Sequence, residues 1–252
     1  MRYWTVNPCA PEDASVLRRK IKWRTVLMKR ITVLLADDHE VVLEGLQMLL
    51  NLEDDIEVIG EAKTGREAVL MTKKLHPDVV VMDIAMPVLN GLEATRQILK
   101  AVPATKVLVL SAHSDDAYVD QFVAMGASGY ITKQSTTQVL AKAIREVQKG
   151  KIFFGPSISK RFHDRERTSL NGKGQIKKQN VRLSSRETEV LQLVAEGMAN
   201  KQVAGELEIS IKTVEKHRQH LMEKLKIHDT AGLTRYAISA GVIESSIQST
   251  IR

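Results

Sequence analysis

Short runs of Val, Leu and Ile alternate with amphipathic stretches along residues 31–150. Brief runs rich in β-branched residues are typical of buried strands, whereas longer segments with apolar residues three or four apart are typical of helices. The pattern predicts strands near 31–36, 56–60, 79–82, 106–111 and 128–131, and helices near 40–50, 65–75, 91–101, 116–125 and 136–149. This repeated alternation predicts an α/β domain with a doubly wound (βα)5 parallel sheet, for which 2-1-3-4-5 is a common strand order.

Polar residues follow four of these apolar runs directly. They are Asp37-Asp38, Asp83, Ser111 and, shortly after Tyr130, Lys133. With the strand order 2-1-3-4-5, the carboxyl ends of strands one, three, four and five are neighbours, about 4.8 Å apart. We therefore expect these side chains to converge on one rim of the sheet, where ligands of such folds bind.

The residue types on this rim suit a site that accepts a phosphoryl group. Mg²⁺ takes oxygen ligands from one or two carboxylates together with phosphate and water. We expect Asp38 and Asp83 to be direct ligands and Asp37 to act nearby. Backbone around Ile84 and Ala85 would complete the metal shell.

Asp83 is the candidate nucleophile, because a carboxylate can attack a phosphoryl donor to give an acyl phosphate. Lys133 would place a cation beside the phosphoryl oxygens, and Ser111 would donate a hydrogen bond to them. Each residue alone has an ordinary explanation as a helix cap, a turn former or a solvated lysine. Their joint position at four adjacent strand ends favours the chemical interpretation.

Residues 183–243 contain four short helical patterns with clear boundaries. Ser184 and Glu187 have the spacing of a capping box, Gly197 follows the first helix, Asn200 opens the second and Ser210 caps the third. The third helix, residues 211–226, carries Val214, Leu221 and Leu225 on one side and polar residues on the other. The polar side consists of Lys212, Glu215, Lys216, Gln219 and Glu223. Such a face is usually only solvated, but it can also enter a DNA major groove.

Length and charge support two domains of different character. The chain has 252 residues; residues 30–149 carry a net charge of −5 and residues 150–252 a net charge of +7. A basic C-terminal third suits a polyanion such as nucleic acid. The only cysteine, Cys9, excludes an intramolecular disulfide framework, and no stretch has the pattern of a signal peptide or membrane span, so we expect a cytoplasmic protein.

The expected boundaries follow from these composition changes. We expect the α/β domain at 29–150, a polar, glycine-containing linker at 151–182, a helical domain at 183–245 and a tail at 246–252. Residues 1–28 are expected to be a disordered extension or to precede the natural start, because Met28 lies just before the first strand. A basic interaction arm is the alternative for this segment.

The motifs ADDHE, MDIAMPVLNG, LSAH and GYITK closely resemble the receiver domain of bacterial two-component response regulators. The resemblance implies that Asp83 is the phosphoacceptor and that a sensor histidine kinase is the donor. It also implies that Tyr130 is a switch aromatic that moves inward as Ser111 is drawn to the phosphoryl group. A tyrosine that merely packs at the sheet edge is the alternative.

Residues 183–227 strongly resemble the LuxR/NarL-type helix-turn-helix through Arg186-Glu187, Glu196-Gly197, Asn200-Lys201 and Lys212-Thr213-Val214. By that resemblance residues 211–226 are the recognition helix, and a fourth helix over 231–240 pairs two such domains into a homodimer. The implied DNA contacts are Lys201, Lys212, Thr213, Glu215, Lys216, Arg218, Gln219 and His220.

Together these features predict a transcription regulator switched by phosphorylation, with Mg²⁺ as cofactor and promoter DNA as partner. Turnover of an external substrate is not expected. A phosphatase of the haloacid dehalogenase type is one alternative, but its nucleophile lies in an Asp-x-Asp pair after the first strand, where this chain has adjacent Asp37 and Asp38. A protein-interaction module is the other alternative, and salt-dependent DNA binding would distinguish it.

Overall fold

The structure is a computed structural model that describes residues 30–112, 116–156, 158–160 and 183–243. The expected extension at 1–28, residues 161–182 of the expected linker and the tail at 246–252 lie outside these ranges. The chain divides into two compact units, residues 1–30 and 31–252. All features below belong to the second unit.

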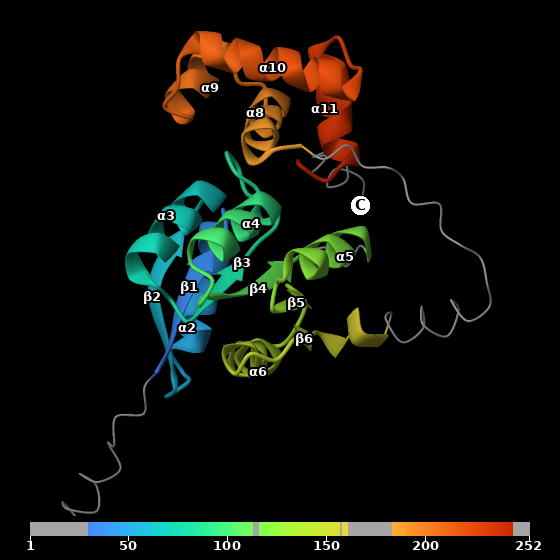
Figure 1. Ribbon diagram of the computed structural model, residues 1–252. Helices are drawn as coiled ribbons and strands as arrows, with labels where there is room; N and C mark the ends of the chain where they lie inside the picture. Colours follow the sequence, from blue (N-terminus) through green and yellow to red (C-terminus); the bar gives the residue numbers. More distant parts are fainter. Residues whose placement is uncertain (1–29, 113–115, 157, 161–182, 244–252) are drawn as a thin grey trace, which may run out of the picture. The chain divides into compact units, whose positions relative to one another are not determined.

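A parallel sheet forms the centre of the receiver domain (Figure 1). Its strands are β1 (Ile31–Ala36), β2 (Ile56–Ala62), β3 (Val79–Met82), β4 (Lys106–Ser111), β5 (Gly129–Thr132) and β6 (Phe153–Phe154). The order β2-β1-β3-β4-β5-β6 confirms the predicted order and adds one strand. The added strand β6 comes from the stretch expected to be linker, and it pairs with β5 through Gly129–Phe153 and Tyr130–Phe154.

Helices cover both faces of this sheet because its strands are apolar on both sides. In β1, Val33 and Leu35 join one buried cluster whereas Leu34 and Ala36 join another. The first cluster is completed by α2 (Glu40–Leu50) and α6 (Thr137–Gln148), and the second by α3 (Gly65–Leu75) and α4 (Gly91–Ala101). Helix α5 (Asp116–Met125) contributes Val119 and Phe122 to a further cluster.

The C-terminal domain has the four predicted helices, α8 (Ser185–Ala195), α9 (Asn200–Glu206), α10 (Ile211–Leu225) and α11 (Thr230–Ser239). The predicted caps are confirmed, since Ser184 forms a capping box with Glu187 and the Ser210 side chain accepts a hydrogen bond from the Thr213 amide. Val214 and Leu221 are fully buried in the core of this domain, as their spacing predicts. Within the described residues, no helix is long and apolar enough to cross a membrane.

Backbone register brings the predicted rim residues to one edge of the sheet. Ala36 is paired with Met82 in neighbouring strands, and the next residue in each strand is an aspartate. The Asp83 amide donates to the carbonyl of Ala36 at 2.8 Å, and the Lys133 amide donates to the carbonyl of Ser111 at 2.7 Å. The polar residues at the strand ends are therefore held by the sheet itself.

Two helical glycines differ in the space available for a side chain. A Cβ on Gly91, at the start of α4, would collide with the backbone carbonyl of Asp83, whereas a Cβ on Gly45 in α2 would meet nothing within 4 Å. We predict that Gly91→Ala lowers the free energy of unfolding by about 1–3 kcal/mol. Gly45→Ala should raise it by about 0.5–1 kcal/mol. Urea titrations of both variants check this pair, and equal effects would contradict the close approach at Gly91.

Candidate functional site

Two buried carboxylates share one lysine at the rim of the sheet. Asp37 follows β1 with 1% of its surface exposed, and Asp83 follows β3 with 3% exposed. The Lys133 Nζ lies 2.7 Å from Asp37 Oδ2 and 3.2 Å from Asp83 Oδ2. The structure therefore brings together three of the residues predicted from separate strand ends.

Burial changes the proton affinity of these groups. It raises the pKa of Asp83 to about 6; Lys133 partly opposes this shift and the neighbouring Asp37 adds to it. Burial alone would lower the pKa of Lys133, but the carboxylates of Asp83 and Asp37 outweigh it and raise the pKa above its usual value. The lysine is thus a fixed cation, and the Asp83 carboxylate has only partial compensation for its buried charge.

A ligand set for a cation surrounds this pair. Ligand atoms of Asp37, Asp38, His39 and Asp83 all lie within 4.8 Å of one another. His39 was missed by the sequence reasoning, and its only signal was its place directly after the two aspartates. Its Nδ1 lies 2.9 Å from Asp38 Oδ1 and 3.1 Å from Asp37 Oδ1. The three carboxylates fit a hard divalent cation, which prefers oxygen ligands.

The remaining receiver residues lie at or beside this rim. Ser111 is buried at the end of β4 and is in register with Thr132 of β5. Tyr130 is buried, with its ring 6.0 Å from that of Phe122 in an edge-to-face contact. Ala85, the expected backbone ligand, is half-buried two residues after Asp83.

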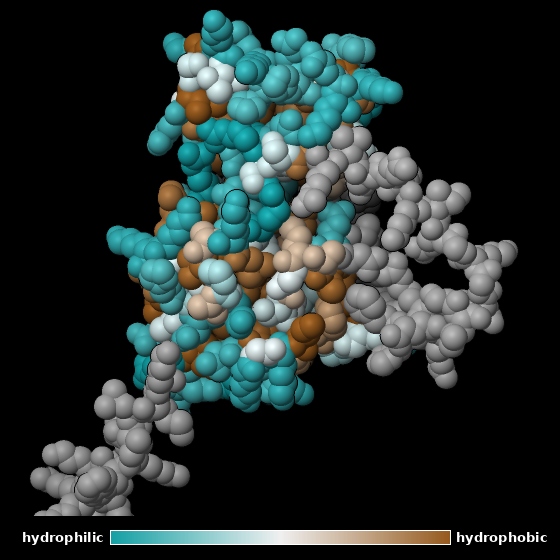
Figure 2. All heavy atoms as spheres, viewed as in Figure 1, coloured by the Kyte–Doolittle hydropathy of each residue, from teal (hydrophilic) through white to brown (hydrophobic). Residues whose placement is uncertain are grey.

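The polar side of α10 is accessible, as the sequence predicts. Its side chains are hydrophilic in the space-filling view (Figure 2). The exposed side chains on this side include Lys212, Glu215, Lys216, Gln219, His220 and Glu223. Lys201 is exposed near the start of α9, whereas Thr213 is half-buried and its hydroxyl lies 2.8 Å from that of Ser210.

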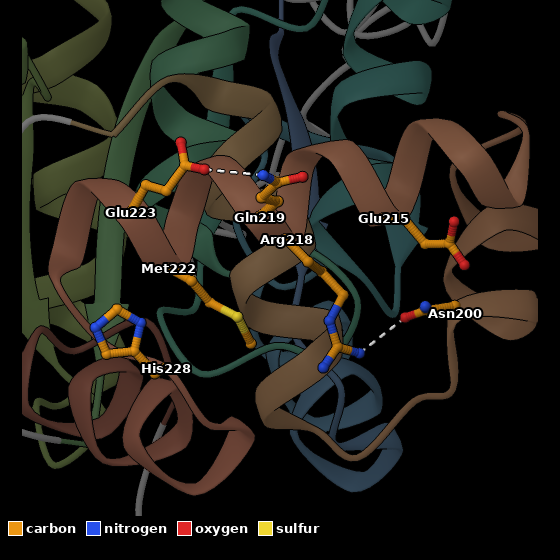
Figure 3. A pocket seen from close by; sticks show the side chains of 7 residues that line it. All are labelled: Asn200, Glu215, Arg218, Gln219, Met222, Glu223 and His228. Carbon is orange, nitrogen blue, oxygen red and sulfur yellow. Dashed lines mark hydrogen bonds between the residues drawn. The ribbon is translucent and has the colours of Figure 1, made fainter.

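Arg218 differs from the other candidate DNA contacts because it is engaged within the domain. Its guanidinium donates to Asn200 Oδ1 at 2.8 Å, at the start of α9, and to Thr230 Oγ1 at 3.0 Å, at the start of α11. A pocket beside α10 is lined by Asn200, Glu215, Arg218, Gln219, Met222, Glu223 and His228 (Figure 3). Arg218 thus links α10 to both neighbouring helices, which the periodicity of one helix could not reveal.

Comparison with known families agrees with this geometry. Residues 33–145 match the response regulator receiver domain, and residues 181–237 match the bacterial regulatory proteins of the luxR family. The two matches coincide with the sheet domain and the helical domain.

Relatives resemble the chain across both domains. The oxygen regulatory protein NreC of Staphylococcus carnosus is 36% identical over 220 residues, which cover 84% of this chain and 99% of NreC. The transcriptional regulatory protein LiaR of Bacillus subtilis is 39% identical over 207 residues, covering 82% of this chain and 96% of LiaR. A solved RcsB–DNA complex matches with a TM-score of 0.52 and 28% identity, covering 84% of this chain and 99% of that chain.

Both halves of the chain and their order in the sequence are those of these regulators. The chain therefore belongs to the NarL/LuxR family of response regulators, phosphorylation-dependent transcription regulators that join a receiver domain to a LuxR-type DNA-binding domain.

Proposed function

We propose that Asp83 is the residue that accepts the phosphoryl group, and that a sensor histidine kinase donates it. An Asp83 carboxylate oxygen attacks phosphorus and forms a new O–P bond while the P–N bond of the phosphohistidine breaks. The bonding electron pair stays on the imidazole nitrogen, which then takes up a proton. The bridge from Lys133 to Asp37 and Asp83 carries the proposal, because it fixes a cation where phosphoryl oxygens would gather.

Asp37, Asp38 and Asp83 would hold Mg²⁺ together with the backbone carbonyl of Ala85, and the ion would offset the negative charge of the transferring group. Lys133 would keep its charge throughout and pair with a phosphoryl oxygen. Ser111, at the end of the neighbouring strand, would donate a hydrogen bond from its hydroxyl to another oxygen. Tyr130 would then pack in the space next to Ser111 in the phosphorylated state.

We further propose that α10 reads promoter DNA in the major groove. The exposed Glu215, Lys216 and Gln219 would meet base edges, and Lys201, Lys212, Thr213 and His220 would contact phosphates. A structural relative, RcsB, has been solved bound to DNA, and another RcsB structure contains two dimers on two DNAs. These relatives support DNA as a partner and a homodimer, whose two subunits would pair through α11. The chain would act in the cytoplasm, where it would meet the chromosome.

Arg218 has a second role in this proposal. Its two hydrogen bonds hold the start of α9 and the start of α11 against α10. It would therefore position the face of α10 that contacts DNA, even where its own side chain also approaches a phosphate.

Substitution of Asp83 tests the phosphoryl transfer. We predict that the phosphorylated wild-type chain binds a promoter fragment from a binding-site selection about 5- to 150-fold more tightly than the unphosphorylated chain. Asp83→Asn should abolish this gain, whereas Asp54→Asn, at an exposed aspartate, should preserve it. Fluorescence anisotropy with and without kinase and ATP measures the effect. A full gain in Asp83→Asn would contradict the assignment.

The pH dependence of stability tests the buried charge. The pKa of Asp83 is raised to about 6 in the folded chain, so stability contributed by the protonated carboxyl is complete below pH 4 and is lost as pH rises through 6. Without divalent ions, Asp83→Asn should be more stable than wild type by about 1–3 kcal/mol at pH 7.5. The difference should vanish below pH 4. Urea titrations across this range check it, and a less stable variant at pH 7.5 would show that Lys133 over-compensates the charge.

The two kinds of α10 residue should be separable by mutation. Lys216→Ala should weaken promoter binding by about 1–3 kcal/mol without changing the melting temperature, because its side chain is exposed. Arg218→Ala should weaken binding and also lower the melting temperature, because it removes the hydrogen bonds to Asn200 and Thr230. Anisotropy and thermal unfolding measure both effects. An unchanged melting temperature in Arg218→Ala would make it a DNA contact only.

A further inference from the structure

The loop that follows Asp83 is held by a side chain of the DNA-binding domain. This acceptor loop, residues 84–90, connects β3 to α4. Gln192 of α8 donates from Nε2 to the carbonyl of Met86 at 2.9 Å, and its Oε1 accepts from the Asn90 amide at 2.7 Å. Gln192 is 1% exposed. One buried amide group thus bridges two backbone positions of the loop.

Asn90 extends this contact to Val242, three residues after the end of α11. Its Nδ2 donates to the carbonyl of Val242 at 2.8 Å, while its Oδ1 caps α4 by accepting from the Glu93 amide at 2.9 Å. Removing Gln192 would therefore leave the buried Met86 carbonyl and Asn90 amide without their partner. It would also loosen Asn90, which caps α4 and contacts the DNA-binding domain.

Val88 in the same loop is held in an unfavourable conformation. It has φ of +70°, a left-handed value that is rare for a β-branched residue. Its amide donates to the Glu196 carboxylate at 3.2 and 3.3 Å, and its side chain packs against the core of the DNA-binding domain. Such strain persists only where surrounding contacts enforce it, so these contacts support the conformation of the loop.

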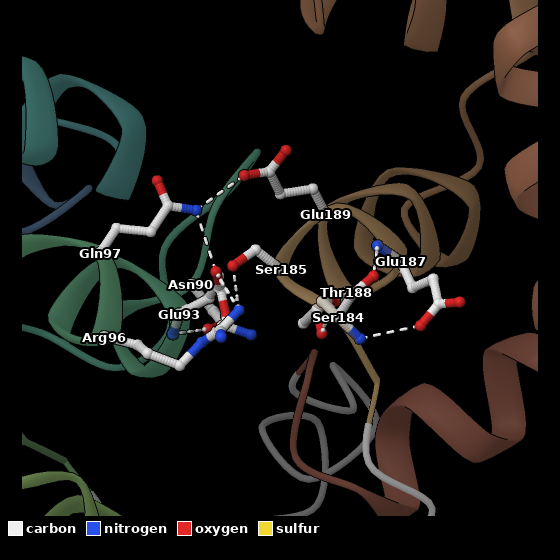
Figure 4. A network of polar contacts seen from close by, with 9 residues as sticks. All are labelled: Asn90, Glu93, Arg96, Gln97, Ser184, Ser185, Glu187, Thr188 and Glu189. Atoms are coloured by element: carbon white, nitrogen blue, oxygen red, sulfur yellow. Dashed lines mark hydrogen bonds and ion pairs between the residues drawn. The ribbon is translucent and has the colours of Figure 1, made fainter. Parts of the chain in front are cut away.

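Side chains of α4 add a second row of polar contacts (Figure 4). Gln97 Nε2 donates to Glu189 Oε1 at 2.7 Å, and Arg96, paired with Glu93, also contacts the hydroxyl of Ser185. Gln97, Glu189 and Ser185 are half-buried and Arg96 is exposed. Among the polar side chains of the DNA-binding domain that contact α4 or the acceptor loop, Gln192 is the most fully buried, and polar contacts contribute more where solvent is excluded.

We propose that Gln192 is a positioning residue that couples the state of Asp83 to the DNA-binding domain. It stabilises the acceptor loop in the conformation that accompanies the free Asp83 carboxylate. An acyl phosphate adds a dianionic group beside the backbone of Ile84 and Ala85. The loop then shifts toward the new charge, Met86 and Asn90 lose their hydrogen bonds to Gln192, and α8 is freed. The inference rests on the proposed role of Asp83.

The contact does not act by covering the reading face. Lys216 and Gln219 of α10 are exposed while Gln192 is engaged. The contact restrains α8 and, through Asn90 and Val242, the residues that follow α11. Coupling is reciprocal: if modification of Asp83 weakens the contact by some factor, then loss of the contact must favour the modified state of Asp83 by that same factor.

The test measures the affinity of the full-length chain for beryllium trifluoride in the presence of Mg²⁺, followed by fluorine NMR. Beryllium trifluoride is a phosphoryl mimic that coordinates a carboxylate oxygen. We expect Gln192→Ala to bind it at least about fivefold more tightly than wild type. Gln192→Glu, which keeps the acceptor for Asn90 but replaces the donor to Met86, should shift affinity in the same direction. Gln148→Ala, at an exposed glutamine of α6, should match wild type.

Hydrogen exchange of the same samples reports on the loop directly. Amides of residues 88–90 should exchange faster in both Gln192 variants and in wild type saturated with beryllium trifluoride. Wild-type affinity in both Gln192 variants would overturn the proposal, and the Glu variant keeps the test valid if Gln192→Ala does not fold. Asp83→Asn separates the two proposals, because binding by that variant would refute the role of Asp83 rather than that of Gln192.

Discussion

The shared contact of Lys133 with Asp37 and Asp83 is the interaction on which the receiver site depends. Two carboxylates that are almost wholly buried would repel each other strongly without a cation between them. Lys133 meets both at 2.7 and 3.2 Å, yet burial, together with the neighbouring Asp37, keeps the pKa of Asp83 raised. The site is therefore short of positive charge, which favours a divalent cation beside the proposed nucleophile.

The sheet determines where that charge lies, and the acceptor loop determines what responds to it. The backbone N–H of Asp83 donates a hydrogen bond to the Ala36 carbonyl and fixes the residue to the sheet, whereas the residues directly after it are held in part by Gln192 and Glu196 of the other domain. A change at the carboxylate thus has a short covalent path to the interface. Val88 lies on this path with a left-handed backbone, and its side chain packs against the core of the DNA-binding domain.

Most of the fold could be predicted from the sequence because its elements are strongly patterned. Most strands of the receiver are short apolar runs, and the helices between them have regular apolar spacing. Strand β6 was missed because Phe153 and Phe154 are too few to show a period, and their strand conformation depends on pairing with β5. The rim residues were predictable because parallel strands bring their carboxyl ends together whatever their separation in the chain.

The contacts that sequence reasoning missed depend on partners that no local pattern specifies. Gln192 lies between the apolar residues of α8, and nothing in the helix period shows that its partners lie in a loop about a hundred residues earlier. The link from Arg218 to Asn200 and Thr230 likewise depends on how three helices cross. His39 contacts the two aspartates through the turn geometry after β1.

The central claim is that one particular carboxylate becomes an acyl phosphate. It is tested most directly by phosphorylating the full-length chain, reducing the acyl phosphate with borohydride, which converts the modified aspartate to homoserine, and locating that residue by peptide mass spectrometry. The account predicts homoserine at position 83 and at no other aspartate. Homoserine at position 37 or 38, or none in a chain that has taken up phosphate, would contradict it.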